Sequence, residues 1–282
     1  MGLNIRQVIT QNFEGLKGYL RTLEGAAIAF SAGVDSTFLL KTAKDVFGDN
    51  VIAITAKSCV MPEGELNAAI EFCKKENIKH VVFDFDVLNV ENFKENPVNR
   101  CYICKKELFT KIKNIAKDNG FETVLDGSNA DDVKDYRPGL QALEELGIKS
   151  PLRESNLSKD EIRLISNVIG LDTWNKPSNA CLATRFAYGD EITKEKLKKV
   201  DEAEIALLNL GFRQFRVRIH SNLARLEVTR EELAKVLSNR DKITERLKAI
   251  GFDYITLDLQ GYRTGSMNEL LNKDEIEEKK AD

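Results

Sequence analysis

Short apolar runs alternate with longer helical segments through the first half of the chain, and no other feature constrains the fold as strongly. Four runs of five or six residues have the apolar composition of buried strands: 26–30, 51–55, 80–85 and 122–127. Three segments between them are long enough for helices of ten residues or more: 36–47, 63–76 and 105–118. Buried strands that alternate with such helices are typical of a doubly wound parallel sheet. The sequence therefore predicts an α/β domain whose ligands bind beyond the carboxyl ends of the strands.

The pattern changes near Tyr188, where we predict a boundary between domains of 1–187 and 188–282. Beyond it, a helical segment precedes two alternating strand patterns around the turn Ser221-Asn222, and two helices and the strand "YITLDL" follow. This order predicts a smaller C-terminal α+β domain with an antiparallel sheet.

Composition narrows the class of protein. The 282 residues are 42% hydrophobic and 31% charged with only 5 prolines, which is typical of a globular chain. A net charge of −3 and a pI near 5.7 argue against a nucleic-acid partner. Apolar runs of membrane-spanning length are missing, and the N-terminus lacks the apolar core of a secretory signal. We therefore expect a cytoplasmic protein without a membrane partner.

The stretch "AAIAFSAGVDSTFLL" (26–40) places a tight turn of small residues between a predicted strand and a predicted helix. Backbone N–H groups at a helix N-terminus, together with the helix dipole, form an anion site. Ser31 and Ser36 can add hydroxyl donors, and Gly33 allows the backbone to approach a phosphate closely. Because the Gly-Lys-Ser/Thr of a Walker A motif is missing, the turn predicts a phosphate site of another kind.

A second loop, after the strand at 122–127, is rich in carboxylates and amides. Asp126, Asn129 and Asp131 lie within "LDGSNADDVKDYRPG" (125–139). Since loops that follow parallel strands lie at the same edge of the sheet, we expect these side chains beside the phosphate site. Their oxygens suit Mg²⁺ or a ribose.

Five cysteines, an odd number in an acidic chain of this size, argue against a disulfide framework. Cys101 and Cys104 form a C-x-x-C pair at a predicted helix start, a motif shared by zinc, redox and iron–sulfur sites. A second C-x-x-C is missing, which weakens the zinc-ribbon interpretation. Three cysteines can hold a 4Fe–4S cluster with one iron open, and Cys181 is the predicted third ligand. Cys59 and Cys73 lie in apolar or helical patterns and are predicted to be buried structural thiols.

The turn at 31–36 resembles the Ser-Gly-Gly-x-Asp-Ser signature of the PP-loop ATP pyrophosphatase superfamily, with Ala32 in place of the first glycine. The resemblance implies a PP-loop/adenine nucleotide alpha hydrolase-like fold that cleaves ATP between the α and β phosphates. A methyl group at Ala32 is tolerated if its φ is negative. The implied Mg²⁺ ligands are Asp35 and Asp131. The implied ATP-binding residues are Ser31, Ala32, Gly33, Val34, Asp35, Ser36, Asp126 and Asn129.

Six segments that span nearly the whole chain together resemble the LarE family, the pyridinium-3,5-bisthiocarboxylic acid mononucleotide synthases. They are "FSAGVDSTFLLK", "NRCYICKKELF", "VLDGSNADDVKDYRPGLQAL", "TWNKPSNACLATRFAYG", "RVRIHSNLARLE" and "YITLDLQGYRTGSMN". The resemblance implies a sulfurtransferase that adenylates a carboxylate of pyridinium-3,5-biscarboxylic acid mononucleotide and converts it to a thiocarboxylate. This step belongs to the biosynthesis of the nickel-pincer cofactor of lactate racemase. The implied partners are the small-molecule mononucleotide and a sulfide source.

The family divides by its sulfur source. One type sacrifices a single cysteine, in the loop that matches 176–185 here, and lacks the C-x-x-C. The other type binds a 4Fe–4S cluster through three cysteines and carries the sulfide on the open iron. Because this chain has Cys101, Cys104 and Cys181, we predict the cluster type, with sacrifice of Cys181 as the alternative mechanism.

Three other functions share some of these features. A cluster-dependent tRNA thiolase would keep the turn and the cysteines, but the acidic pI and the short chain argue against it. An amidating PP-loop ligase gives no reason for the C-x-x-C pair. A zinc-stabilised nucleotide-binding scaffold without catalysis would hold one zinc ion in place of the cluster.

Arginines in and near the second domain are candidates for binding the substrate phosphate. Arg216 and Arg218 are two residues apart on a predicted strand and therefore lie on one face. With Arg185, they suit bidentate recognition of the 5′-phosphate that the implied substrate carries. The alternative is a solvated sheet face. The second domain is also expected to support a homo-oligomer.

Overall fold

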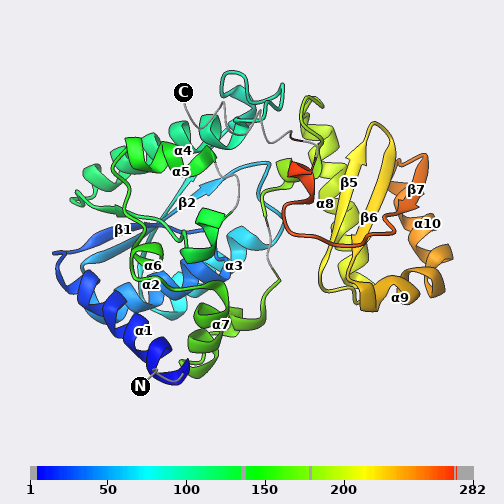
Figure 1. The fold of residues 1–282 in the computed structure, drawn as a ribbon. Helices are drawn as coiled ribbons and strands as arrows, with labels where there is room; N and C mark the ends of the chain where they lie inside the picture. Colours follow the sequence, from blue (N-terminus) through cyan, green and yellow to red (C-terminus); the bar gives the residue numbers. More distant parts are fainter. Residues whose placement is uncertain (1–4, 135–137, 178–179, 270, 272–282) are drawn as a thin grey trace. The chain divides into compact units, whose positions relative to one another are not determined.

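The structure is a computed structural model that describes residues 5–134, 138–177, 180–269 and 271 (Figure 1). The chain forms two compact units. Unit 1 comprises Met1–Ser58, Glu63–Phe85 and Cys101–Ser178. Unit 2 comprises Cys59–Pro62, Asp86–Arg100 and Asn179–Asp282. Unit 2 thus includes two short segments from the first half of the chain as well as Tyr188, and the domains of 1–187 and 188–282 stay a prediction.

The described part of unit 1 contains a sheet of four parallel strands in the order β3-β2-β1-β4. The strands are β1 (Ala26–Ala29), β2 (Val51–Lys57), β3 (Lys79–Asp84) and β4 (Val124–Leu125). The chain adds β2 and β3 on one side of β1 and then returns to place β4 on the other side. The strand order therefore switches between β1 and β4, and ligands of such sheets bind in the crevice at this switch.

Helices cover both faces of this sheet (Figure 1). One face carries α1 (Ile5–Arg21), α2 (Val34–Phe47), α3 (Glu65–Lys75), α6 (Pro151–Glu154) and α7 (Lys159–Val168). The other face carries α4 (Arg100–Asp118) and α5 (Pro138–Glu145). The predicted doubly wound parallel sheet is confirmed. Among the residues described, no helix has both the length and the apolar character needed to cross a membrane.

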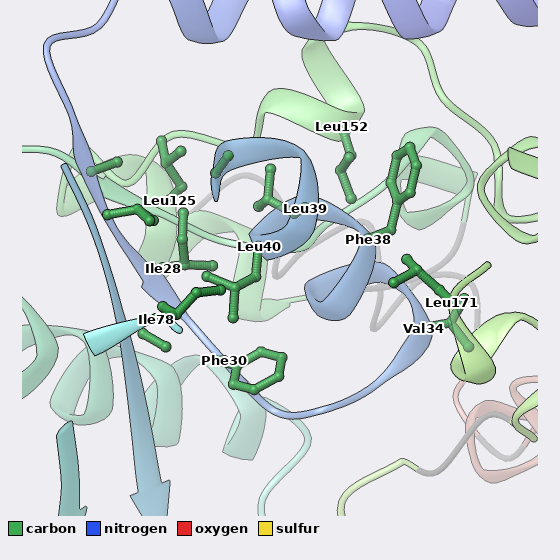
Figure 2. Close-up of a cluster of buried hydrophobic side chains, with 14 of the residues drawn as sticks. Ile28, Phe30, Val34, Phe38, Leu39, Leu40, Ile78, Leu125, Leu152 and Leu171 are labelled. Atoms are coloured by element: carbon green, nitrogen blue, oxygen red, sulfur yellow. The ribbon is translucent and has the colours of Figure 1, made fainter. Parts of the chain in front are cut away.

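Successive side chains of β1 point to opposite sides of the sheet, and both sides are covered by helices. Strand β1 is therefore buried on both faces. Ile28 belongs to the larger hydrophobic core, where it lies near Leu40 of α2 (Figure 2). Ala27, the preceding residue, belongs to a second core with Ile112 of α4. Burial on both faces explains why the sequence of β1 is apolar without interruption.

Unit 2 contains a three-stranded sheet in its described residues, in the order β5-β6-β7. The strands are β5 (Phe215–His220), β6 (Leu223–Val228) and β7 (Tyr254–Leu257), with α8 (Lys194–Asn209) preceding β5. The predicted α+β organisation is confirmed, and β5 and β6 pair antiparallel around the turn Ser221-Asn222. The predicted antiparallel sheet is nevertheless wrong in its last strand, because β7 is parallel to β6. The cause is the helical crossover through α9 (Leu233–Ser238) and α10 (Arg240–Ile250), which returns the chain to the end of the sheet where β6 began.

Candidate functional site

The turn at 31–36 connects β1 to α2 and forms an open cradle. Gly33 is the N-cap of α2, with an extended backbone (φ −73°, ψ 168°). The hydroxyl oxygens of Ser31 and Ser36 lie 3.1 Å apart, and the Ser36 hydroxyl donates to the Gly33 carbonyl oxygen at 3.3 Å. A methyl group added at Gly33 would lie 3.4 Å from Ser31 Oγ and 4.0 Å from Ser36 Oγ. The position without a side chain therefore faces two hydroxyl groups at the positive end of a helix, which suits an oxyanion.

Ala32 does not have the negative φ that we expected to be needed for its methyl group. Its φ is +55°, in the left-handed region, and its side chain is buried in the larger core. A non-glycine residue in this region costs about 1–2 kcal/mol relative to ordinary helical or extended backbone. The expectation of a negative φ is wrong, and the surrounding contacts must hold this turn in place.

Asp35, the second residue of α2, faces a lysine from a distant part of the sequence. Its Oδ2 accepts a hydrogen bond from Lys159 Nζ at the start of α7. Its Oδ1 is buried without a hydrogen-bond partner among the described atoms. Burial raises the pKa of Asp35, the Lys159 ammonium and the Asn129 side chain oppose this shift, and the Asp132 carboxylate adds to it. The carboxylate thus has a spare buried oxygen, which is a suitable ligand for a cation.

The loop after β4 packs directly against the start of α2. A methyl group added at Gly127 would lie 3.1 Å from the backbone nitrogen of Ser36 and 3.2 Å from its Cα. Asp126 is buried and accepts hydrogen bonds at 2.5 Å from the hydroxyls of Ser128 and Ser150. The loops after β1 and β4 therefore meet, as the strand order requires.

Asn129 and Asp131 mainly organise this second loop. The Asn129 side-chain oxygen accepts a hydrogen bond from the Asp131 backbone N–H at 2.9 Å. Asp131 Oδ2 accepts one from the backbone N–H of Lys159 at 2.8 Å. Lys159 is the first residue of α7, whose N-cap Ser158 forms a capping box with Glu161. Asp131 thus binds the N-terminus of α7 and helps to place Lys159 against Asp35.

Sequence reasoning missed two lysines at this edge of the sheet. Lys159 contacts Asp35, and Lys176 Nζ donates to the Ala32 carbonyl oxygen at 3.0 Å and to Glu65 Oε2 at 2.6 Å. The two lysines are 124 and 144 residues away in sequence from the turn residues that they contact. Lys159 lies outside the six quoted segments, and Lys176 lies within one of them but far in sequence from the turn, so only the folded chain reveals these contacts.

Cys101 and Cys104 lie one turn apart on α4 and therefore on the same helix face. Both are half-buried and belong to unit 1, whereas Cys181 is exposed and belongs to unit 2, as the N-cap of a 3₁₀ helix at Leu182–Arg185. Within the described ranges, no three His, Cys, Asp or Glu side chains group as metal ligands. Cys73 is buried as predicted, and burial raises its pKa to about 12, whereas Cys59 is half-buried.

The three predicted arginines lie buried in unit 2, and two of them form bidentate ion pairs. Arg185 pairs with Glu204 at 2.9 and 2.8 Å. Arg218 pairs with Glu227 at 3.0 and 2.9 Å. Burial, followed by the positive charge of Arg185, lowers the pKa of Arg216 to about 10. The predicted alternative of a solvated face is therefore wrong for this part of β5.

The fold and the turn define the class of protein. A parallel sheet flanked by helices, with a tight turn between β1 and the N-terminus of α2 at the switch in strand order, is a PP-loop-like α/β architecture. The chain is 36% identical over 260 residues to the pyridinium-3,5-bisthiocarboxylic acid mononucleotide synthase of Lactiplantibacillus plantarum, over 91% of this chain and 94% of that protein. The chain therefore belongs to the family of this synthase, the LarE family.

The chain is also similar to other proteins. An uncharacterized protein of Synechocystis sp. is 42% identical over 268 residues, which cover 94% of this chain and 100% of the relative. A glutamine-hydrolyzing GMP synthase chain of Thermoplasma volcanium is 29% identical over 188 residues, or 61% of this chain and 59% of that relative. The chain matches no protein-family model.

Proposed function

We propose that this chain is a cytoplasmic, ATP-dependent sulfurtransferase of nickel-pincer cofactor biosynthesis. Its reaction converts a carboxylate of pyridinium-3,5-biscarboxylic acid mononucleotide to a thiocarboxylate. The observation that carries the proposal is the turn at 31–36, where two hydroxyls and the start of α2 surround a position without a side chain. The relationship to a synthase of the bisthiocarboxylic product supports the choice of substrate.

The turn at 31–36 is proposed to hold the pyrophosphate portion of ATP. Backbone N–H groups at the start of α2 and the hydroxyls of Ser31 and Ser36 would donate to phosphate oxygens. These donors are already in place, so they stabilise the charge that develops on pyrophosphate as it leaves. Asp126 and Asn129 shape the neighbouring loop and are proposed to complete the nucleotide site.

Mg²⁺ is proposed to bind with the phosphates at Asp35. The buried Oδ1 of Asp35 supports this assignment because it has no hydrogen-bond partner among the described atoms. Asp131 is the weaker candidate, since one of its oxygens accepts a hydrogen bond from the N-terminus of α7. The ion would add to the positive charge that the start of α2 provides.

The proposed reaction has two steps. A carboxylate oxygen of the substrate attacks the α phosphorus of ATP, the bond from this phosphorus to the bridging oxygen breaks, and pyrophosphate leaves. Sulfide then attacks the carbonyl carbon of the acyl adenylate, and AMP leaves with the former carboxylate oxygen. Sulfur replaces oxygen without a net gain or loss of electrons, so no oxidant is required. The chain contributes by holding the reacting groups in place and by stabilising the leaving group.

Cys101, Cys104 and Cys181 are proposed to bind a 4Fe–4S cluster. Thiolates are the ligands that such clusters take, and Cys101 and Cys104 lie one turn apart on the same face of α4. When bound, the cluster would supply sulfide on an iron that no cysteine occupies.

Sacrifice of Cys181 is the second candidate for the sulfur source, and the exposure of this residue favours it. In this version the Cys181 thiolate attacks the acyl adenylate, AMP leaves, and a thioester forms. Loss of the Cα proton then breaks the Cβ–S bond, so the substrate leaves as a thiocarboxylate with the cysteine sulfur and residue 181 remains as dehydroalanine. Each chain could deliver one sulfur atom only.

The buried arginines of unit 2 are proposed to bind the 5′-phosphate of the substrate. Arg216 is a candidate because it is buried near the positive charges of Arg185 and Arg218, and a bound anion would add to the compensation that Glu204 provides. Arg185 and Arg218, with His220 and Arg225, line a cavity of about 100 Å³. Arg185 and Arg218 would share their charge with Glu204 and Glu227, so we assign them mainly to shaping this site.

Anaerobic reconstitution with iron and sulfide tests the sulfur source. The proposal predicts about four irons and four sulfides per chain. Cys101→Ser, Cys104→Ser and Cys181→Ser should each lower the iron content, while the matched control Cys59→Ser should leave it unchanged. One tight zinc ion per chain would contradict the cluster, and loss of H₂S at Cys181 after turnover, detected by mass spectrometry, would favour sacrifice. Light scattering of the same samples tests the expected homo-oligomer.

A further inference from the structure

Lys176 contacts the turn at 31–36 and a buried carboxylate at the same time. Its Nζ donates to Glu65 Oε2 at 2.6 Å and to the Ala32 carbonyl oxygen at 3.0 Å. The Glu65 side chain, at the start of α3, is only 9% exposed. A carboxylate that is this well desolvated depends on a nearby cation, because an unpaired buried charge is costly. The ammonium group is therefore fixed between α3 and the turn.

The backbone of Lys176 is fixed as well. Arg163 of α7 donates from Nη2 to the Lys176 carbonyl oxygen and from Nη1 to the Trp174 carbonyl oxygen, both at 2.7 Å. One guanidinium group thus holds the chain on both sides of residue 175. Because the two ends of the Lys176 side chain are anchored independently, its ammonium group can hold another group in place at little further cost in entropy.

The group that Lys176 holds is the peptide between Ala32 and Gly33. This peptide is trans and planar, so its carbonyl oxygen and its N–H point in opposite directions. A hydrogen bond from Lys176 to the Ala32 carbonyl therefore turns the Gly33 N–H away from Lys176. Gly33 is the N-cap of α2, so its N–H lies outside the hydrogen-bonded part of the helix and can serve a ligand.

The same hydrogen bond explains how Ala32 keeps a left-handed backbone (φ +55°). A strained residue persists only where the surrounding structure fixes its conformation. The Ala32 methyl group is buried in the core on one side of the turn, and its carbonyl oxygen is bound to the ammonium group. Together these contacts determine the peptide plane.

We propose that Lys176 and Glu65 are a positioning pair that sets the Ala32–Gly33 peptide so that the Gly33 N–H can donate to a phosphate oxygen. Lys176 acts through the backbone and is not itself assigned as a phosphate ligand. The inference rests on the proposed function, because it takes the pyrophosphate portion of ATP as the anion bound at this turn.

Two measurements test the pair on the full-length protein. The first follows the backbone amide of Gly33 by NMR without any ligand, and the second measures the binding of inorganic pyrophosphate with Mg²⁺ by calorimetry. In Lys176→Met, the Gly33 amide resonance should shift and the pyrophosphate affinity should fall by about tenfold, the effect expected when a well-placed hydrogen bond to a charged group is lost. Lys176→Arg, which keeps the positive charge and a donor, should restore part of the affinity.

Two further variants separate positioning from folding. Lys176→Met leaves Glu65 buried without its lysine, so the double variant Lys176→Met/Glu65→Leu removes both charges and should regain the lost thermal stability while the affinity stays low. The matched control Lys75→Met removes a lysine from an exposed ion pair with Asp172 at 3.5 Å and should change neither measurement.

The outcomes distinguish this inference from the proposed function. An unshifted Gly33 amide in Lys176→Met, or a double variant that binds pyrophosphate as tightly as the unaltered protein, would overturn the positioning role. If the unaltered protein bound neither pyrophosphate nor ATP, the proposed nucleotide site would fail. In that case the NMR comparison alone would still decide whether Lys176 sets the orientation of the peptide.

Discussion

At the scale of single residues, a substitution of Gly33 should affect ligand binding much more than the stability of the fold. Its extended backbone accepts alanine without strain, so Gly33→Ala should lower the free energy of unfolding by about 1 kcal/mol or less, the cost of a poorer N-cap. The added methyl group would occupy the space beside the hydroxyls of Ser31 and Ser36 and should weaken the binding of MgATP by at least about tenfold. Calorimetry and thermal unfolding of the same samples measure both effects. Unchanged affinity would contradict the placement of phosphate in the turn.

His80 gives the stability of the chain a predictable dependence on pH. Its ring Nε2 lies 2.8 Å from the Thr55 hydroxyl, and burial lowers its pKa below the ordinary value of 6.5. As the pH falls, the unfolded chain takes up this proton before the folded chain does, so the free energy of unfolding decreases. The contribution is complete above pH 6.5 and is lost as the pH falls through the folded-state pKa.

Chemical denaturation between neutral pH and mildly acidic pH measures this dependence. His80→Gln should flatten it, because the variant removes one group whose pKa differs between the two states. His220, whose pKa is also lowered by burial, remains in the variant and should account for part of the remaining slope. Identical slopes for His80→Gln and the unaltered protein would show that His80 does not titrate in this way.

At the scale of elements, the close approach of the β4 loop to α2 is testable through Gly127. A methyl group at this position would press on the backbone of Ser36, which the helix holds rigidly. Gly127→Ala should therefore lower the free energy of unfolding by about 1–3 kcal/mol, as overpacking does. The control Gly15→Ala, in the interior of α1 with open space around the added methyl group, should raise it by about 0.5–1 kcal/mol. A Gly127→Ala variant as stable as the unaltered protein would contradict the tight contact.

Most elements of unit 1 could be predicted from the sequence, whereas the direction of β7 could not. The core strands and helices of unit 1 were predictable because burial on both faces leaves β1 and residues 51–54 of β2 continuously apolar, which is a local signal. The direction of β7 was not, because it depends on where the crossover through α9 and α10 returns the chain. A four-residue strand has the same pattern in either direction.

At the scale of the whole molecule, some residues of the candidate site could be predicted from the sequence and others could not. The turn at 31–36 was predictable because its residues are consecutive, so one short stretch contains the anion site. Lys159 and Lys176 were not, because they reach the turn only through the packing of α7 and the segment after it. The positive φ of Ala32 was also hidden, since it reflects contacts from Lys176 and the core rather than the local sequence.

At the scale of the whole molecule, the central proposal is the reaction itself, the ATP-dependent conversion of a carboxylate to a thiocarboxylate. One anaerobic experiment tests it: the reconstituted protein is mixed with pyridinium-3,5-biscarboxylic acid mononucleotide, ATP, Mg²⁺ and sulfide, and all products are measured together by mass spectrometry and chromatography. Our account predicts a thiocarboxylate product, with AMP and pyrophosphate formed in equal amount to it, and more than one sulfur transferred per chain. Release of ADP and phosphate, or a thiocarboxylate that forms equally well without ATP, would contradict it.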